Sequence, residues 1–185
     1  MIKMTDEMRD LIDNAIANST PCILATASKA GEPHMSFRGS VMVFDDESLA
    51  YWDRVKRQSL QHIAENPQVC ILFRHPHKRI IWQFLGEATI HDSGPVREQV
   101  MARVVQPELD RDPERKGIAI VIRINKILLG NGDVLQQRDA WRLAAPRSRR
   151  PSWRLHTPQA DVLIPAVGRD PGAFGRPEVR GSVEP

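Results

Sequence analysis

Three basic residues, Arg54, Lys56 and Arg57, gather just ahead of Ser59, where an apolar strand-like run gives way to a helical pattern. The free N–H groups and the dipole at a helix N-terminus favour an anion, and arginine adds a forked pair of charged donors. These residue types at a strand-to-helix junction are therefore consistent with an anion-binding site. A solvent-exposed basic turn is the competing interpretation, and on spacing alone it is the commoner one.

Other reactive side chains give weaker signals. His75 and His77 could chelate a metal, but no third ligand type stands at suitable spacing, so we expect a surface loop and no metal site. Cys22 and Cys70 lie inside apolar runs, without the charged neighbours that activate a thiol, and are expected to be buried rather than nucleophilic. His62 could reach a ligand or a partner subunit, although half-exposed helix surface is the commoner setting for such a residue.

The composition indicates a soluble protein of the reducing cytoplasm. A chain of 185 residues is long enough to bury a core as one domain. Residues 1–17 carry acids through their apolar spacing, unlike a signal peptide, and no later run approaches the length of a membrane span. We therefore expect no membrane partner.

The net charge of +3 has a definite location in the chain. Residues 1–142 hold equal numbers of basic and acidic residues, whereas residues 143–185 hold seven arginines, four acids and seven of the fourteen prolines. We therefore predict a domain over residues 1–142, followed by a Pro/Arg-rich tail over 143–185 that is disordered or loosely attached. An arginine-rich stretch, 146–154, leaves nucleic acid or another anionic partner as an unlikely alternative.

Hydrophobic periodicity predicts a mainly β domain. Thr5 is a good N-cap for an opening helix, and two further helices are expected near 59–65 and after 92–95. The connections are short, and the runs at 69–73 and 118–122 are apolar on both faces, which together favour an antiparallel barrel with flanking helices over a Rossmann fold. The expected strands, of which the first three would form a meander, are 22–28, 34–44, 49–53, 69–75, 80–90 and 117–127.

Several motifs follow one another in a recognisable order. Arg38 is followed by a turn at 45–48, the aromatic strand end Tyr51-Trp52, the basic cluster at 54–59, and Asn66-Pro67-Gln68-Val69. In this order the chain, over roughly residues 6–139, resembles the FMN-binding split β-barrels of the pyridoxamine 5'-phosphate oxidase-like family. Strands 80–90, with its Gly-x-Ala, and 116–127 match later parts of the same pattern.

The resemblance implies a fold, a cofactor and a set of roles. The fold would be an antiparallel split β-barrel that binds FMN at the interface of a homodimer. The doubly apolar strands, which need more cover than one small chain provides, also favour this dimer. The residues implied at the FMN phosphate are Arg54, Arg57 and Ser59, with Lys56. Those implied along the ribityl chain and ring are Arg38, Gly39 and Ser40, with Trp52 near the phosphoribityl end and Arg79 at the polar edge of the flavin.

Departures from the family pattern limit what can be transferred. The true pyridoxamine phosphate oxidases carry a lysine in place of Val43, a threonine in place of Asp53, and an Arg-Lys pair in place of Gln58-Ser59. Their C-terminal substrate signature is also missing, because the similar letters at 153–158 have different spacing. We therefore do not expect the vitamin B6 activity.

The leading interpretation is a flavin oxidoreductase that acts on an unidentified small molecule. The flavin would carry the hydride or electron chemistry while the protein binds and orients it, so the absence of an obvious general acid or base is expected. The alternative from another class is a non-catalytic binder of FMN, haem or a deazaflavin.

Overall fold

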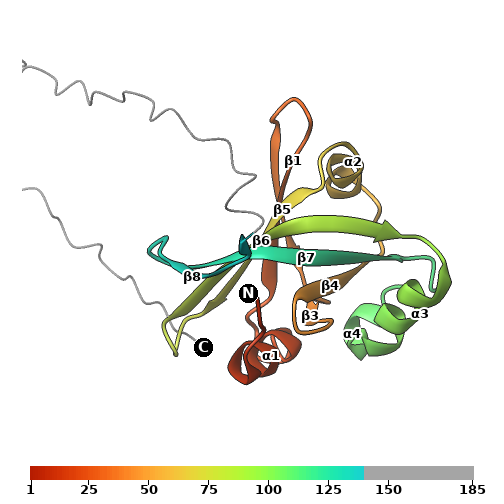
Figure 1. The fold of residues 1–185 in the computed structure, drawn as a ribbon. Helices are drawn as coiled ribbons and strands as arrows, with labels where there is room; N and C mark the ends of the chain where they lie inside the picture. The colour runs from red at the N-terminus through yellow and green to blue at the C-terminus, as the bar shows by residue number, and fades with distance from the viewer. Residues whose placement is uncertain (140–185) are drawn as a thin grey trace, which may run out of the picture. The chain divides into compact units, whose positions relative to one another are not determined.

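Strands dominate residues 1–139, the part of the chain that the computed structural model describes (Figure 1). The predicted boundary at 142 and the tail at 143–185 lie outside these residues. The helices are α1 (Asp6–Asp13), α2 (Gln58–Glu65), α3 (Gly94–Arg103) and α4 (Gln106–Leu109). The strands are β1 (Cys22–Ala27), β2 (Pro33–Arg38), β3 (Met42–Val43), β4 (Ser48–Asp53), β5 (Gln68–His75), β6 (Ile80–His91), β7 (Ile118–Leu129) and β8 (Val134–Gln137).

All eight strands belong to one antiparallel sheet, in the order β2-β1-β5-β6-β7-β4-β3, with β8 paired to β7. β2 and β3 stand at opposite ends of this order although only residues 39–41 separate them in the chain. The strands therefore form a mostly antiparallel half-barrel with flanking helices, as expected for a split barrel, and the split lies between β2 and the β3–β4 hairpin. The predicted fold class is confirmed.

The predicted meander of the first three strands is wrong, because the chain breaks inside 34–44. β2 pairs with β1, whereas β4 pairs with β3 and β7. At the break, the hydroxyl of Ser40 accepts a hydrogen bond from the Trp52 amide (3.0 Å) and lies 3.1 Å from the Trp52 carbonyl oxygen. A side chain thus takes the place of ladder hydrogen bonds where the strand crosses to the other edge of the sheet.

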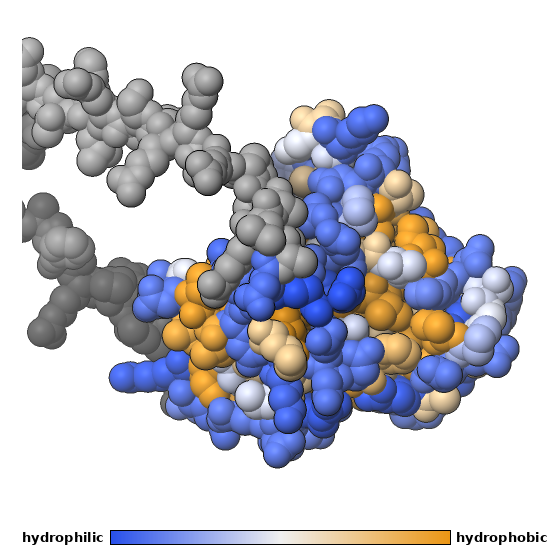
Figure 2. All heavy atoms as spheres, in the orientation of Figure 1, coloured by the Kyte–Doolittle hydropathy of each residue, from blue (hydrophilic) through white to orange (hydrophobic). Residues whose placement is uncertain are grey.

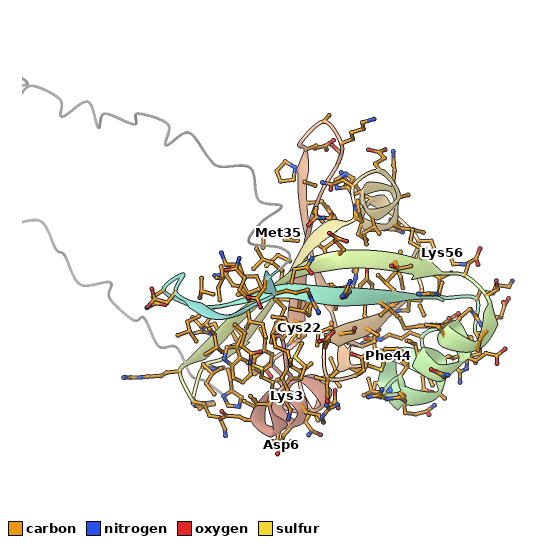
Figure 3. The ribbon with its side chains drawn as sticks, viewed as in Figure 1. Lys3, Asp6, Cys22, Met35, Phe44 and Lys56 are labelled. Atoms are coloured by element: carbon orange, nitrogen blue, oxygen red, sulfur yellow. The ribbon has the colours of Figure 1, made fainter. Side chains whose placement is uncertain are left out.

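The barrel interior is filled by large side chains from most strands and from α1. Thr5 caps α1 as predicted, since its hydroxyl accepts from the Met8 amide at 3.1 Å. Leu11 and Ile12 of α1 enter the main core, which also contains Tyr51, Phe73, Phe84 and all five isoleucines of β7. Figure 3 shows the side chains packed between α1 and the sheet, with the buried Cys22 among them.

A second, smaller core lies under α3 and holds Trp52. The Trp52 indole N–H donates to the Asp112 carboxylate (2.9 Å), which also accepts from the Gly117 amide (2.8 Å). The Arg97 guanidinium lies 4.8 Å from the centre of the Trp52 ring and donates to the Gly117 carbonyl. A methyl group at Gly117 would come 2.2 Å from the indole nitrogen, so this close approach requires glycine. The loop before β7 therefore locks Trp52 in place.

The surface seen in Figure 2 is mostly hydrophilic, with hydrophobic areas near the β8 end and between α2 and α3. On β8, Val134 and Leu135 are exposed. The most exposed large apolar side chains within the strands are Met35 (62% exposed) and Phe37 (71%), which alternate along β2 on its outer side. Among the described residues, no helix is both long and apolar enough to span a membrane.

Candidate functional site

Arg38, the last residue of β2, joins three elements across the split of the barrel. One terminal nitrogen donates to the Ser59 hydroxyl of α2 at 2.5 Å and lies 3.6 Å from the Asp53 carboxylate at the end of β4. The guanidinium also lies 5.2 Å from the centre of the Tyr51 ring. The Arg38 side chain is only 16% exposed and that of Asp53 3%, so this ion pair is largely shielded from water. The fold therefore brings together two of the predicted site residues, Arg38 and Ser59.

Asp53 organises the turn between β4 and α2. One carboxylate oxygen accepts from the amides of Val55 (3.1 Å) and Lys56 (3.0 Å), and Lys56 takes a positive φ of 51°. The other oxygen has no hydrogen-bond donor, although it faces Arg38. The backbone donors of this turn are thus already occupied by a carboxylate of the chain itself.

Unpaired polar atoms gather around this ion pair. Among the described residues, five buried side-chain atoms lack a hydrogen-bond partner, and four of them belong to Ser36, Arg38, Tyr51 and Asp53. Burial raises the pKa of the Tyr51 phenol far above its usual value, an effect that nearby Arg38 partly opposes, so the phenol keeps its proton and remains a donor. Because buried polar groups are normally satisfied, this concentration marks a site for water or a ligand.

The N-terminus of α2 is only partly prepared for an anion. Arg57 occupies the N-cap position without a side-chain cap, and the first turn contains no acid. Lys56 and Arg57 are exposed and border an open surface hollow, whereas Ser59 is buried. His62 is buried too, with its ring nitrogen 3.2 Å from the Thr26 hydroxyl. The expectation of half-exposed helix surface at His62 is therefore wrong, because this face of α2 packs on β1 and β2.

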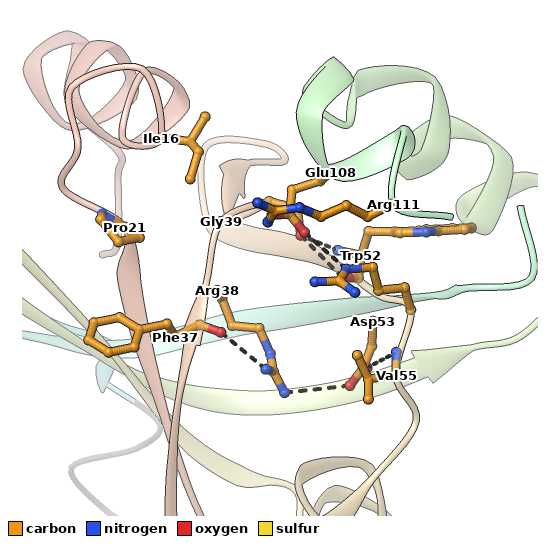
Figure 4. A pocket seen from close by; sticks show the side chains of 12 residues that line it. Ile16, Pro21, Phe37, Arg38, Gly39, Trp52, Asp53, Val55, Glu108 and Arg111 are labelled. Carbon is orange, nitrogen blue, oxygen red and sulfur yellow. Dashed lines mark hydrogen bonds and ion pairs between the residues drawn. The ribbon is translucent and has the colours of Figure 1, made fainter. Parts of the chain in front are cut away.

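A pocket of about 270 Å³ adjoins Arg38 and Asp53 (Figure 4). Two segments that are distant in sequence, 37–40 and 52–55, form much of its wall, together with Ile16, Pro21 and residues of α4 and the turn after it. Glu108, a buried residue of its lining, accepts from Arg111 at 3.0 Å and from Arg54 at 3.4 Å. The pocket therefore combines apolar walls with guanidinium groups.

The predicted site residues are distributed unevenly. Arg38, Gly39, Ser40, Trp52 and Arg54 all line the pocket. Lys56, Arg57 and Ser59 lie at the junction with α2. Their assignment to a flavin stays a prediction.

The remaining candidates lie outside this site. Arg79 is in the hairpin between β5 and β6 and borders hollows with Ile80 and Ile81 rather than this pocket. The rings of His75 and His77 are 6.2 Å apart, and no group of three metal-ligating side chains occurs in residues 1–139.

Glu108 and Arg111 were missed by sequence reasoning. They lie at and just after α4, a helix of four residues that contains a proline and has too few positions to show a period. Only the acid-to-arginine spacing of three, which also occurs on ordinary helix surfaces, could have pointed to their ion pair.

Solved structures with the same fold are known. HupZ from Group A Streptococcus shares 23% identity, with a TM-score of 0.55 over 71% of this chain and 98% of HupZ. A putative pyridoxamine 5'-phosphate oxidase from Lactobacillus delbrueckii shares 20%, with a TM-score of 0.54 over 68% of this chain and 93% of that one. An FMN-binding protein from Syntrophomonas wolfei shares 14%, with a TM-score of 0.55 over 67% and 86%. At these identities the likeness concerns the fold.

No curated protein sequence matches the chain. A family model does match, however, and it covers most of the domain. Residues 4–127, more than half of the chain, fit the model described as pyridoxamine 5'-phosphate oxidase. The match spans α1 through most of β7 and includes every strand and loop that builds the pocket. The chain therefore belongs to the pyridoxamine 5'-phosphate oxidase family of split β-barrels.

Proposed function

We propose that the protein is an FMN-binding flavoprotein and an oxidoreductase for a small molecule. The observation that carries the proposal is the pocket between segments 37–40 and 52–55, which contain five of the residues that the family resemblance links to the flavin, namely Arg38, Gly39, Ser40, Trp52 and Arg54. Folding brings them together around Arg38 and Arg54 although they are separate in sequence. The FMN-binding protein from Syntrophomonas wolfei, which has the same fold, adds support.

The residues present fit a flavin in chemical kind. Phe37, Pro21 and Val55 supply apolar wall for a planar ring, and Arg54 supplies charged donors for a phosphate. The unpaired atoms of Arg38 and Asp53 supply a donor and an acceptor for polar groups. The flavin itself supplies hydride or electron transfer, while these side chains bind it, orient it and keep water from it.

A homodimer is part of the proposal. The pocket volume of about 270 Å³ is slightly below the roughly 300–1,000 Å³ usual for small-molecule sites, which suits one half of a site shared between two subunits. Phe37 lines the pocket and is also 71% exposed, and Met35 lies beside it on the outer side of β2. A second copy that covers β2 would therefore bury this apolar surface and close the pocket in one step.

The dimer is tested by sedimentation velocity at micromolar concentration. Phe37→Asp should give monomers, because a carboxylate would be buried in the interface, whereas Val134→Asp on exposed β8 should leave the dimer intact. A wild-type monomer, or equal effects of the two variants, would remove this part of the proposal.

The flavin is tested by the absorbance spectrum of the purified protein, by identification of the released chromophore, and by FMN titration. Arg54→Ala should weaken FMN binding by about tenfold to a hundredfold, the effect of losing a charged hydrogen bond. Arg74→Ala, at an exposed arginine on β5, is the matched control and should change nothing. Protein that is colourless and takes up no FMN, or that holds haem or a deazaflavin instead, would overturn the proposal.

Catalysis is a separate question from binding. Anaerobic addition of NADH or NADPH should bleach the flavin absorbance of an oxidoreductase that uses a nicotinamide donor. A flavin that neither these donors nor any other small-molecule substrate reduces would identify a carrier without turnover.

We also propose that the protein works in the cytoplasm, where Cys22 and Cys70, free in the structure, would remain thiols.

A further inference from the structure

We infer that the anionic group of the pocket's ligand, the phosphate in the case of FMN, binds to the Arg54–Arg111 pair held by Glu108, and that Asp53 excludes it from the N-terminus of α2. The inference deepens the proposed function and rests on it for the identity of the ligand. It separates Arg54 from the other predicted phosphate residues and adds two residues, Glu108 and Arg111, that the sequence pattern did not indicate.

The junction with α2 already contains an anion. Asp53 takes the amides of Val55 and Lys56 with one oxygen and faces Arg38 with the other. Arg38 in turn donates to Ser59, the only side chain of the first turn of α2 that is buried. A phosphate placed between Arg38 and Ser59 would compete with Asp53 for the Arg38 guanidinium and would lie beside a carboxylate that is only 3% exposed. Asp53 also lines the pocket, but its ion pair is with Arg38, whereas Arg54 and Arg111 pair with Glu108.

The Arg54–Arg111 pair, in contrast, has donors to spare. Glu108 accepts from one nitrogen of each guanidinium, at 3.4 Å and 3.0 Å. In the described part of the chain, the terminal nitrogens of Arg54 and the other two nitrogens of Arg111 make no hydrogen bond or ion pair. Both side chains line the pocket, so the pair offers forked, charged donors to a ligand inside it.

Glu108 acts as a positioning residue for this pair. It is buried and reaches both guanidinium groups from α4, so that one carboxylate orients two cations and leaves the pair with net positive charge (Figure 4). Gly39 allows this arrangement, because a methyl group there would come 2.7 Å from a Glu108 oxygen. A larger residue at position 39 would therefore require the Glu108 carboxylate to move.

FMN and riboflavin test the inference, because they share the ring and ribityl chain and differ by the phosphate. Arg111→Gln should weaken FMN binding by about tenfold or more and leave riboflavin binding unchanged. Arg111 is 60% exposed, so its replacement should not disturb folding. Arg57→Gln at the α2 N-cap is the matched control and should leave both affinities within about twofold. If Arg57→Gln weakens FMN binding while Arg111→Gln does not, the phosphate binds at α2 and the inference is wrong.

The variant Asp53→Asn tests whether Asp53 excludes the phosphate from the N-terminus of α2. It preserves the acceptor for the Val55 and Lys56 amides and removes the charge beside Arg38, so FMN should bind more tightly and riboflavin equally well. In this background Arg57→Gln should begin to weaken FMN binding, because the α2 site is now open. Unchanged or weaker FMN binding by Asp53→Asn would contradict the exclusion.

Failure of the proposed function looks different from failure of the inference. If neither flavin binds, the proposed function fails. A calorimetric titration with phenyl phosphate then tests the anion site alone. Binding that Arg111→Gln abolishes and Arg57→Gln leaves intact would support the inference for another anionic ligand. Absence of phenyl phosphate binding, or binding that Arg111→Gln leaves intact, would overturn it. If FMN binds no better than riboflavin, the flavin site stands and the inference falls.

Discussion

Replacing Arg38 with methionine should lower the free energy of unfolding by about 3–5 kcal/mol, the usual cost of leaving a buried partner charge without its counterion. The Asp53 carboxylate is 3% exposed, and the oxygen that faces Arg38 at 3.6 Å has no hydrogen-bond donor in the structure. Methionine keeps much of the arginine's length and apolar stem, so most of the loss reflects the ion pair and the contact with the Tyr51 ring rather than an empty cavity.

A double-mutant cycle separates the ion pair from the packing. In the Arg38→Met background, Asp53→Asn removes the uncompensated charge and should restore part of the loss, with a coupling between the two sites of about 1–3 kcal/mol. Urea unfolding followed by tryptophan fluorescence measures each variant, and an unchanged dependence on urea would show that the native state has kept its compactness.

The exposed pair Arg9–Asp46 provides a matched control. Its atoms are closer, at 3.1 Å, but its side chains are 37% and 69% exposed, against 16% and 3% for Arg38 and Asp53. Arg9→Met should therefore cost under about 1 kcal/mol, because water screens the pair. Equal costs at the two sites, or an Arg38→Met cost below about 1 kcal/mol, would refute the argument that burial rather than distance sets the energy.

Three other changes have definite expected outcomes. Thr5→Ala removes the cap on the Met8 amide and should cost about 1 kcal/mol, measured by thermal unfolding. Gly117→Ala would force a methyl group against the Trp52 indole and should destabilise the protein by about 1–3 kcal/mol and shift the tryptophan emission; a neutral effect would contradict the tight packing. Burial raises the pKa of the Cys22 thiol to about 12 and that of Cys70 to about 11, so labelling by iodoacetamide at pH 8 should be slow until urea unfolds the protein.

Local chemistry explains which elements the sequence predicted well. The cap at Thr5 and the apolar spacing of the first helix are readable within a few residues, and α1 begins where expected. The strands predicted at 69–75, 80–90 and 117–127 correspond to β5, β6 and β7. Long apolar runs in a small domain must be buried in its core, so these strands are predictable from the sequence. The four-residue β8 was not predicted, since its alternation is short and half of it is exposed.

The break between β2 and β3 could not be predicted for a different reason. Apolar and polar residues alternate from 34 to 38, and the apolar run at 41–44 follows after only two small residues, so the segment resembles one long strand. β2 and β3 are separated by contacts with residues that are distant in the sequence. Ser40 hydrogen-bonds to the Trp52 backbone, and β3 pairs with β4 at the other edge of the sheet. Tertiary contacts of this kind leave no mark on local periodicity.

The candidate site shows the same limit. The order of motifs pointed to segments 38–40 and 54–59, and the structure places the first in the pocket and divides the second between the pocket and α2. That division depends on the orientation of the Arg54 side chain, which is set by its hydrogen bond to Glu108, a residue 54 positions later in the chain. A single sequence shows that a cluster is basic but not which of its members share a partner.

Phe37 connects the two parts of the proposed function. Its backbone carbonyl accepts from Arg38 at 3.2 Å, and its ring forms part of the pocket wall while also being the most exposed large apolar side chain within the sheet. Under the proposal, the same ring contacts the flavin and the second subunit, so the flavin and the partner subunit pack against one side chain and each stabilises the binding of the other. By mass action, FMN must then favour the dimer, and dilution to monomers must release FMN. Because β2 is an edge strand beside the split, the proposed partner subunit would also cover strand edge that otherwise faces water.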